Sequence, residues 1–156
     1  MKRAIPFKNY ELKIRRLSVH EQPPGYGSAI TQPQDVAGIA RELIGDNAQE
    51  SFIALLLDIK NRVVGVTEVA RGAVDGCGVD VRQVFRVAIA VGASALVVAH
   101  NHPSGDCTPS DVDRRLTERI KKAADLLGIP LLDHVIVSDT GFKSLQTLGF
   151  FQTNHS

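Results

Sequence analysis

Two histidines and, a short loop later, a serine and an aspartate are the residues most able to do chemistry in this sequence. His100 and His102 end an apolar run, and Ser110 and Asp113 follow Pro103-Ser104-Gly105. Residues two apart on a strand face the same side, so the two imidazoles point together. Residues three apart share one face of a helical turn. A strand end and a helix start are therefore predicted to bring two imidazoles, a carboxylate and a hydroxyl together.

These residue types suit a metal ion with one open position. A catalytic zinc ion has three protein ligands and keeps water in the fourth position, and here the three would be His100, His102 and Asp113. Bound zinc lowers the pKa of its water from about 15.7 to roughly 7, which supplies hydroxide at neutral pH. Ser110 would donate a hydrogen bond as charge develops on oxygen. The pattern predicts one zinc ion per chain and hydrolytic chemistry.

Each part of the pattern also has a simpler interpretation. A His-x-His pair often marks a polar strand end, and Ser110 with Asp113 fits a capping box. Thr108 competes as the helix cap, since Pro109 would then occupy the first helical position and Asp111 stands three residues on. A nuclease interpretation of the letters HNH is set aside, because the residues of that motif are dispersed along a chain.

The surrounding sequence predicts an α/β fold with a mixed sheet flanked by helices. Apolar runs and turn residues predict strands over 51–59, 62–70, 94–102, 131–138 and 142–145. Helices are expected after a cap at Asp35, closed by Gly45, from Asp80 to Val91, and over 111–127. Two hairpins interrupt the alternation of strands and helices, so uniform parallel crossovers are not expected.

Length and composition predict one domain preceded by an arm. A chain of 156 residues with 44% hydrophobic residues can build one sound core. Residues 1–33 are predicted to form a basic arm and a Pro/Gly linker, and 34–156 the domain. Neither a signal peptide nor a membrane-spanning apolar run is found, so a cytoplasmic protein with Cys77 and Cys107 reduced is expected, away from membranes.

The spacing His-x-His, seven residues, Ser-x-x-Asp resembles the JAMM motif of JAB/MPN metalloproteases. The string HNHPSG at 100–105, with RQVF at 82–85 and LLDHVIV at 131–137, is similar to the RadC-like branch of that family, over roughly 34–150. The resemblance implies a JAB/MPN fold with cytidine-deaminase-like three-layer architecture. It also implies a zinc-dependent hydrolase of peptide or isopeptide bonds in a peptide or protein substrate.

The same resemblance implies a glutamate on an earlier strand that acts on the metal-activated water. Glu68 is the only acidic residue of the strand predicted over 62–70 and is the candidate general acid/base. Strand faces alternate, so the register decides whether Glu68 faces the metal, and a bulge could change it. The other interpretation of Glu68 is a solvated or salt-bridged surface residue.

Four further polar residues near the motif are given supporting roles. His134 is interpreted as a core or supporting histidine, and Asn101 as a strand-end residue that bonds the backbone. Asp106 and Asp111 are interpreted as water-exposed carboxylates of the loop and the helix start.

A different class of function stays open, namely a catalytically silent interaction module with the same fold, linked to DNA repair or mobile elements. RadC-like proteins are often labelled DNA repair proteins, but longer members carry a helix-hairpin-helix region that residues 1–33 lack. The formal net charge is +1, and the basic arm contributes Lys2, Arg3, Lys8, Lys13, Arg15 and Arg16. That balance gives no chain-wide electrostatic footprint for nucleic acid.

We therefore expect any DNA binding to be weak, independent of sequence and strongly salt-dependent, because it would rest on phosphate contacts from one short arm. Fluorescence anisotropy with two unrelated duplexes across a salt series checks this. Sequence-specific binding that persists at high salt would contradict it.

Overall fold

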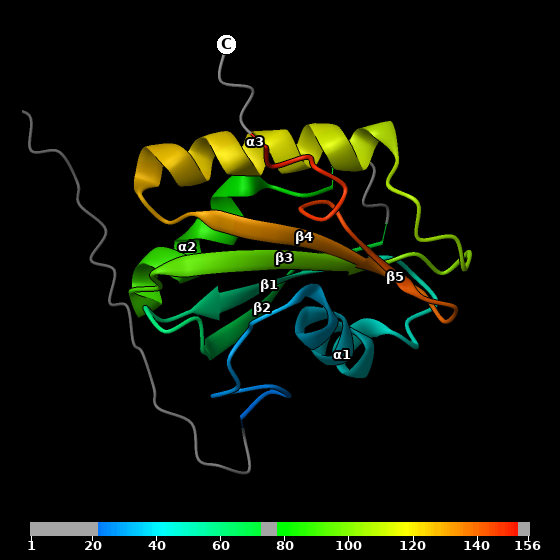
Figure 1. Ribbon diagram of the computed structural model, residues 1–156, viewed down its shortest axis with the longest axis horizontal. Helices are drawn as coiled ribbons and strands as arrows, with labels where there is room; N and C mark the ends of the chain where they lie inside the picture. The colour runs from blue at the N-terminus through cyan, green and yellow to red at the C-terminus, as the bar shows by residue number, and fades with distance from the viewer. Residues whose placement is uncertain (1–21, 73–77, 153–156) are drawn as a thin grey trace, which may run out of the picture.

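The computed structural model describes residues 22–72 and 78–152 and places a five-stranded sheet between helices (Figure 1). The strands stand in the order β2-β1-β3-β4-β5. Only β3 and β4 are parallel, and the other neighbours are antiparallel. The elements in chain order are α1 (Pro33–Ile44), β1 (Ser51–Leu57), β2 (Val63–Arg71), α2 (Val81–Val91), β3 (Ala95–Asn101), α3 (Asp111–Leu127), β4 (Leu131–Val137) and β5 (Phe142–Ser144). The α/β fold with a mixed sheet is confirmed.

Helices cover both faces of the sheet, and this explains the continuous apolar runs of its strands. Alternate residues of β1, namely Phe52, Ala54 and Leu56, join the core formed with α2 and α3. Ile53, Leu55 and Leu57 join the second core, formed with α1. All seven residues of β1 are buried, because neither face of this strand meets water.

The predicted helix starts need two corrections. Helix α3 begins at Asp111 as predicted, but its cap is Ser110 and not Thr108. Helix α1 begins at Pro33, before the predicted cap Asp35. The Asp35 carboxylate instead accepts hydrogen bonds from the Thr31 amide and hydroxyl (2.8 and 2.9 Å) and the Gln32 amide (3.1 Å). Both carboxylates, Asp35 and Asp113, lie in the first helical turn, where the helix dipole favours negative charge.

The basic arm lies outside the described residues, but the end of the predicted linker is well defined. Gly27 and Ile30 donate backbone hydrogen bonds to the carbonyls of Val63 (2.7 Å) and Asn61 (2.8 Å). The Ser28 carbonyl accepts from the Val63 amide at 2.9 Å. Residues 27–30 thus run beside the β1–β2 turn and lead directly into α1.

The Asn101 side chain, at the end of β3, forms hydrogen bonds to the backbone at the start of β1 and just before it. Its Oδ1 accepts from the Ser51 amide at 2.6 Å, and its Nδ2 donates to the carbonyls of Asn47 (3.1 Å) and Gln49 (3.2 Å). The side chain is 1% exposed. Its predicted role as a strand-end residue that bonds the backbone is confirmed, and it holds the segment before β1 beside the neighbouring histidines.

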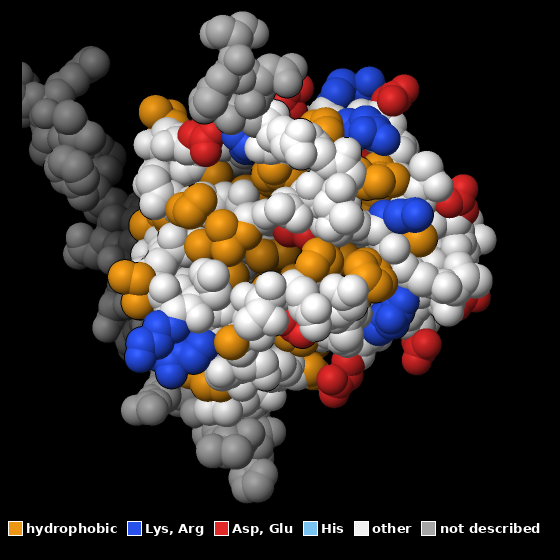
Figure 2. All heavy atoms as spheres, viewed as in Figure 1, with side chains coloured by type: hydrophobic (Ala, Val, Ile, Leu, Met, Phe, Trp, Pro, Cys, Tyr) orange, Lys and Arg blue, Asp and Glu red, His pale blue; other side chains and the backbone are white. Residues whose placement is uncertain are grey.

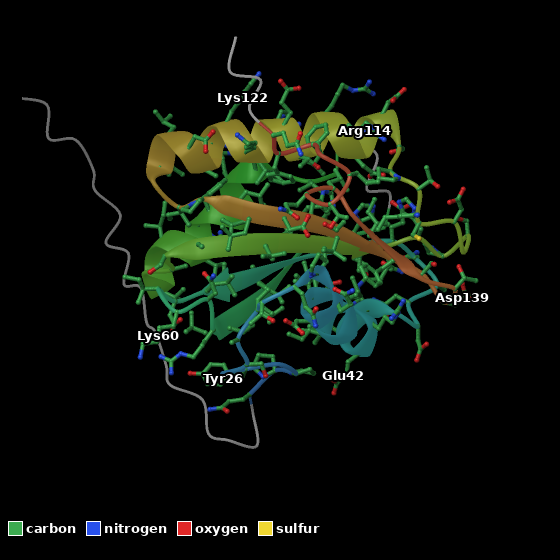
Figure 3. The ribbon with its side chains drawn as sticks, viewed as in Figure 1. Tyr26, Glu42, Lys60, Arg114, Lys122 and Asp139 are labelled. Carbon is green, nitrogen blue, oxygen red and sulfur yellow. The ribbon has the colours of Figure 1, made fainter. Side chains whose placement is uncertain are left out.

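The end of the sheet where β3 finishes is the end where α3 starts (Figure 1). In Figure 3, Arg114 of α3 and Asp139 of the β4–β5 turn lie at this end, whereas Lys60 of the β1–β2 turn lies at the other. All residues of the predicted metal site except Glu68 belong to the end of β3, the following loop or the start of α3.

The molecular surface in Figure 2 has Lys and Arg side chains interspersed with Asp and Glu, around exposed hydrophobic side chains. On this face the Lys and Arg side chains of the described residues form separate groups and not one patch that crosses the surface. Within 22–72 and 78–152, no helix combines the length and apolarity needed to cross a membrane.

We expect Asn101→Ala to lower the free energy of unfolding by about 1–3 kcal/mol, because it leaves the buried Ser51 amide without an acceptor. Urea denaturation followed by circular dichroism measures this. Glu42→Ala, at an exposed position of α1 (Figure 3), is the control and should change stability by less than about 0.5 kcal/mol. Equal stability of the two variants would contradict the role given to Asn101.

Candidate metal centre

His100, His102 and Asp113 bring their ligand atoms to one point. The Nε2 atoms of the two histidines are 2.9 Å apart. Carboxylate oxygens of Asp113 lie 3.2 Å from Nε2 of His100 and 3.5 Å from Nε2 of His102. A tetrahedral zinc ion with bonds of about 2.0–2.1 Å separates its ligand atoms by roughly 3.3 Å. The predicted ligands therefore form a group that could hold one metal ion.

The outer nitrogen of each histidine has its own partner. Nδ1 of His102 lies 2.7 Å from the Asp106 carbonyl, which can only accept, so this nitrogen carries the hydrogen. Nδ1 of His100 lies 2.8 Å from Nε2 of His134. With Nδ1 protonated, a neutral imidazole presents a lone pair on Nε2, and that is the form in which histidine binds metal.

His134 is fully buried behind His100, in the supporting position that the sequence predicted. Burial, followed by the nearby His100, holds the pKa of His134 well below its usual range, so the ring is neutral. Its Nδ1 lies 2.6 Å from the Thr117 hydroxyl, which is 2.6 Å from the Asp113 carbonyl. No sequence signal marked Thr117, although it stands one helical turn after Asp113 on the buried side of α3.

Asp113 serves the helix and the ligand cluster together. Its Oδ2 accepts from the Ser110 amide at 2.8 Å, and its own amide donates to the Ser110 hydroxyl at 3.1 Å, which completes the capping box. Burial acts to raise the pKa of Asp113, but the contacts of its carboxylate with the Nε2 atoms of His100 and His102 outweigh it and lower the pKa far below its usual range. The ligand carboxylate is anionic, at the helix end that favours anions.

The charge balance at this point favours a bound cation. The hydrogen bond to Asp113 raises the pKa of His102, against burial, and the Asp106 carbonyl adds to the effect. Two nitrogen lone pairs and a carboxylate converge in a protected place, since the side chains of His100, Asp113 and His102 are 0%, 5% and 13% exposed. Such a set would be satisfied by a proton or by a metal ion.

The loop between the candidate ligands is held by hydrogen bonds at His102 and at Gly105. The His102 amide donates to the Val137 carbonyl at 2.8 Å. The Thr140 hydroxyl donates to the carbonyl of Gly105, which has a φ of 89°. A β-carbon at Gly105 would stand 3.3 Å from an Asp139 carboxylate oxygen, so this turn suits glycine in both backbone angle and space. The loop keeps His102 at the open side of the cluster.

The structure does not bring Glu68 to the three ligands. Ala70 pairs with Phe52 and Glu68 with Ile53, so Val69 is an extra, bulged residue of β2. Glu68 consequently stands opposite Ile53, on the α1 face, whereas Phe52 stacks on His100 on the other face. The carboxylate forms an ion pair with Arg71 at 2.8 Å and is 39% exposed. Its catalytic role remains a prediction, and this geometry matches the salt-bridged interpretation.

Glu50 is a carboxylate near the cluster that the sequence analysis did not single out. Its carbonyl accepts from the Gly72 amide at 2.8 Å, which continues the β1–β2 ladder by one residue. Alternation then places Glu50 on the face of Phe52, two residues later, and of His100. Its charge contributes to the raised pKa of His102. The only signal in the sequence was that Glu50 stands two residues before Phe52, and so on the same face of an extended strand, just outside the predicted bounds of that strand.

The remaining predicted residues lie around the site. Ser110, Asp106 and Asp111 are exposed. The Asp106 carboxylate accepts from the Thr108 amide at 2.9 Å, in a turn of the loop. Cys107 is a free cysteine of intermediate exposure in that loop, and Cys77 lies outside the described residues.

The sequence matches the family model of the RadC-like JAB domain over residues 30–150. It is 44% identical over 125 residues to a UPF0758 protein of Staphylococcus aureus strain NCTC 8325, which covers 80% of this chain and 57% of the relative. A UPF0758 protein of Staphylococcus epidermidis strain ATCC 12228 is 43% identical over 122 residues, with 78% and 54% covered. The chain belongs to the RadC-like JAB family, and spans about half the length of these relatives.

We expect zinc-loaded, dialysed protein to contain about one zinc ion per chain, and His102→Ala to lose most of it, because two remaining ligands hold zinc poorly. Inductively coupled plasma mass spectrometry gives the stoichiometry. His100→Ala should behave alike. Asp139→Asn, a neutral replacement of an exposed carboxylate at the same end of the molecule (Figure 3), should keep its zinc. Unchanged zinc in both histidine variants would refute the site.

Proposed function

We propose that this protein is a zinc-dependent hydrolase of peptide or isopeptide bonds. The observation that carries the proposal is the convergence of two Nε2 atoms and one carboxylate within 4.8 Å, with the outer nitrogens of both histidines engaged elsewhere. Three protein ligands leave a fourth position for water or substrate, as in catalytic rather than structural zinc sites. His102 is the most exposed of the three ligands, so substrate would approach from its side.

A bound zinc ion would lower the pKa of a water molecule to about 7 and so provide the nucleophile. Ser110 would donate its hydroxyl hydrogen to the substrate oxygen on which negative charge develops. Its oxygen accepts from the Asp113 amide, which fixes its position and leaves that hydrogen to donate. The start of α3 adds a positive dipole end at the same place. Both effects would stabilise charge that is present only in the transition state.

A carboxylate must also take the proton of the attacking water and return it to the leaving amine. Two glutamates compete for this role: Glu68, from the sequence analysis, and Glu50. We assign it to Glu50, because its strand parity places it on the face of His100 and its charge acts on His102. Glu68 stands opposite Ile53 and is ion-paired to Arg71. Reassignment to Glu68 would require it to leave that pair and change face.

The second candidate function is a silent interaction module that keeps the fold and binds a protein or nucleic-acid partner. It is favoured by the engagement of Glu68 with Arg71 and would stand if no carboxylate near the cluster proved to act. A chelator separates the two functions: hydrolysis that is abolished by chelation and restored by zinc belongs to the enzyme alone.

We expect Glu50→Gln to lower hydrolysis by about 10²–10⁴-fold while zinc stays bound, because it removes an acid/base group without removing a ligand. Turnover of a fluorogenic peptide and isopeptide library, with zinc content measured on the same samples, tests this. Glu68→Gln is the matched control and should stay within a few-fold of the parent protein. Asp113→Asn should lose zinc and activity together.

The two glutamate variants decide the assignment. Loss of activity in Glu68→Gln alone would return the role to Glu68. Full activity in both variants would exclude both glutamates as the general acid/base. Hydrolysis that survives chelation in the unmodified protein would overturn the proposed function itself.

A further inference from the structure

A closed ring of polar groups runs behind the candidate ligands. Nδ1 of His100 is 2.8 Å from Nε2 of His134, and Nδ1 of His134 is 2.6 Å from Oγ1 of Thr117. Thr117 Oγ1 is 2.6 Å from the Asp113 carbonyl. The Asp113 carboxylate returns to His100 at 3.2 Å, so two of the three ligands belong to one ring.

The Asp113 carbonyl sets the direction of the three hydrogen bonds that link it through Thr117 and His134 to His100, and the remaining contact, between Nε2 of His100 and the Asp113 carboxylate, is where a metal ion would lie. The Asp113 carbonyl can only accept, so the single hydroxyl hydrogen of Thr117 points to it. The Thr117 oxygen must then accept a hydrogen bond from His134, which places the hydrogen of the His134 imidazole on Nδ1. Nε2 of His134 is left as an acceptor, and Nδ1 of His100 must donate to it. His100 thus presents an unprotonated Nε2 to the ligand cluster.

We propose that Thr117 and His134 are positioning residues that fix His100 in the Nδ1-protonated form required of a metal ligand. The proposal rests on the metal site proposed above and concerns how that site is prepared before the metal binds. Thr117 sets the direction of these hydrogen bonds, because its hydroxyl donates to a backbone carbonyl, which can only accept. His134, on β4, connects Thr117 of α3 to His100 of β3, because it donates to the former and accepts from the latter.

The surroundings keep these three residues away from water and restrain the two imidazoles. His100, Thr117 and His134 are each 0% exposed. Phe52 stacks on His100 with ring centroids 5.9 Å apart and meets His134 edge-on at 5.4 Å. Water cannot replace a lost member of the ring at such positions, and apolar contacts restrain both imidazoles. The protonation pattern is therefore set by the ring itself.

Removal of the Thr117 hydroxyl gives a specific expectation. In Thr117→Val the Nδ1 hydrogen of His134 loses its acceptor, so the neutral ring gains by carrying its hydrogen on Nε2 instead. That hydrogen then points at His100, whose own hydrogen moves to its Nε2, the ligand atom. Zinc affinity should fall by about 10–100-fold, as is typical when a group that orients a metal ligand is changed. Thr117→Ser keeps the hydroxyl and should restore affinity to within a few-fold.

The experiment reads the protonated nitrogen directly and separately from zinc binding. Long-range ¹H–¹⁵N spectra of the metal-free full chain distinguish Nδ1-protonated from Nε2-protonated histidines, and a competition titration with a fluorescent chelator gives zinc affinity. The parent protein and Thr117→Ser should show His100 and His134 protonated on Nδ1, and Thr117→Val should show both shifted toward Nε2. A role of Thr117 in packing alone would leave the spectra unchanged.

A second pair of variants covers the case in which Thr117→Val does not fold. His134→Gln offers a side-chain carbonyl to the Nδ1 hydrogen of His100 and should keep zinc affinity within about tenfold, whereas His134→Leu offers no acceptor and should lose more. Equal spectra and equal affinities in Thr117→Val and the parent, or equal affinities of the two His134 variants, would overturn the inference. Failure of the parent itself to bind zinc, with the spectra as expected, would overturn the proposed function and leave the ring intact.

Discussion

The candidate metal site depends on one constraint: to hold a metal ion, two imidazole lone pairs and a carboxylate must face one another within a protected end of the sheet. Groups that all accept hydrogen bonds do not gather without something between them, and this cost grows as water is excluded. The outer nitrogen of each histidine has a partner: His102 donates to the Asp106 carbonyl, and His100, in the arrangement proposed above, donates to His134. The loop, the cap of α3 and the buried ring are all consequences of holding those outer partners in place.

Asp113 belongs both to the helix cap and to the candidate ligand cluster, although the sequence offered these roles as alternatives. The capping box needs Ser110 and Asp113 three residues apart, and so does the ligand cluster with its hydroxyl neighbour. One carboxylate can do both, because Oδ2 takes the Ser110 amide while the two oxygens still reach the histidines. A cap interpretation of such a pair therefore does not count against a metal interpretation.

Most of the fold could be predicted from the sequence, because its signals are local. Asp80 and Gly92 flank α2 as expected, and the predicted bounds of α3 are those observed. The cap of α1 was misplaced, and the choice between Thr108 and Ser110 for α3 stayed open, because each helix start has several polar residues that can cap. Contacts outside the helix choose among them. The bulge at Val69, which moves Glu68 relative to Phe52, leaves no local trace, since one extra strand residue looks like any other.

The convergence of His100, His102 and Asp113 could be predicted from the sequence, whereas the residues behind them could not, and the reason is physical. A ligand set needs particular residue types at fixed spacing within one stretch, whereas a support needs only the right atom at the right point in space. Thr117 occupies an ordinary inward position of an amphipathic helix, and Glu50 stands just outside a strand. Yet every buried side-chain nitrogen and oxygen of the described residues has a hydrogen-bond partner. A polar ring within an apolar core is tolerated on that condition, because an unsatisfied polar group there would carry the full cost of its lost hydration.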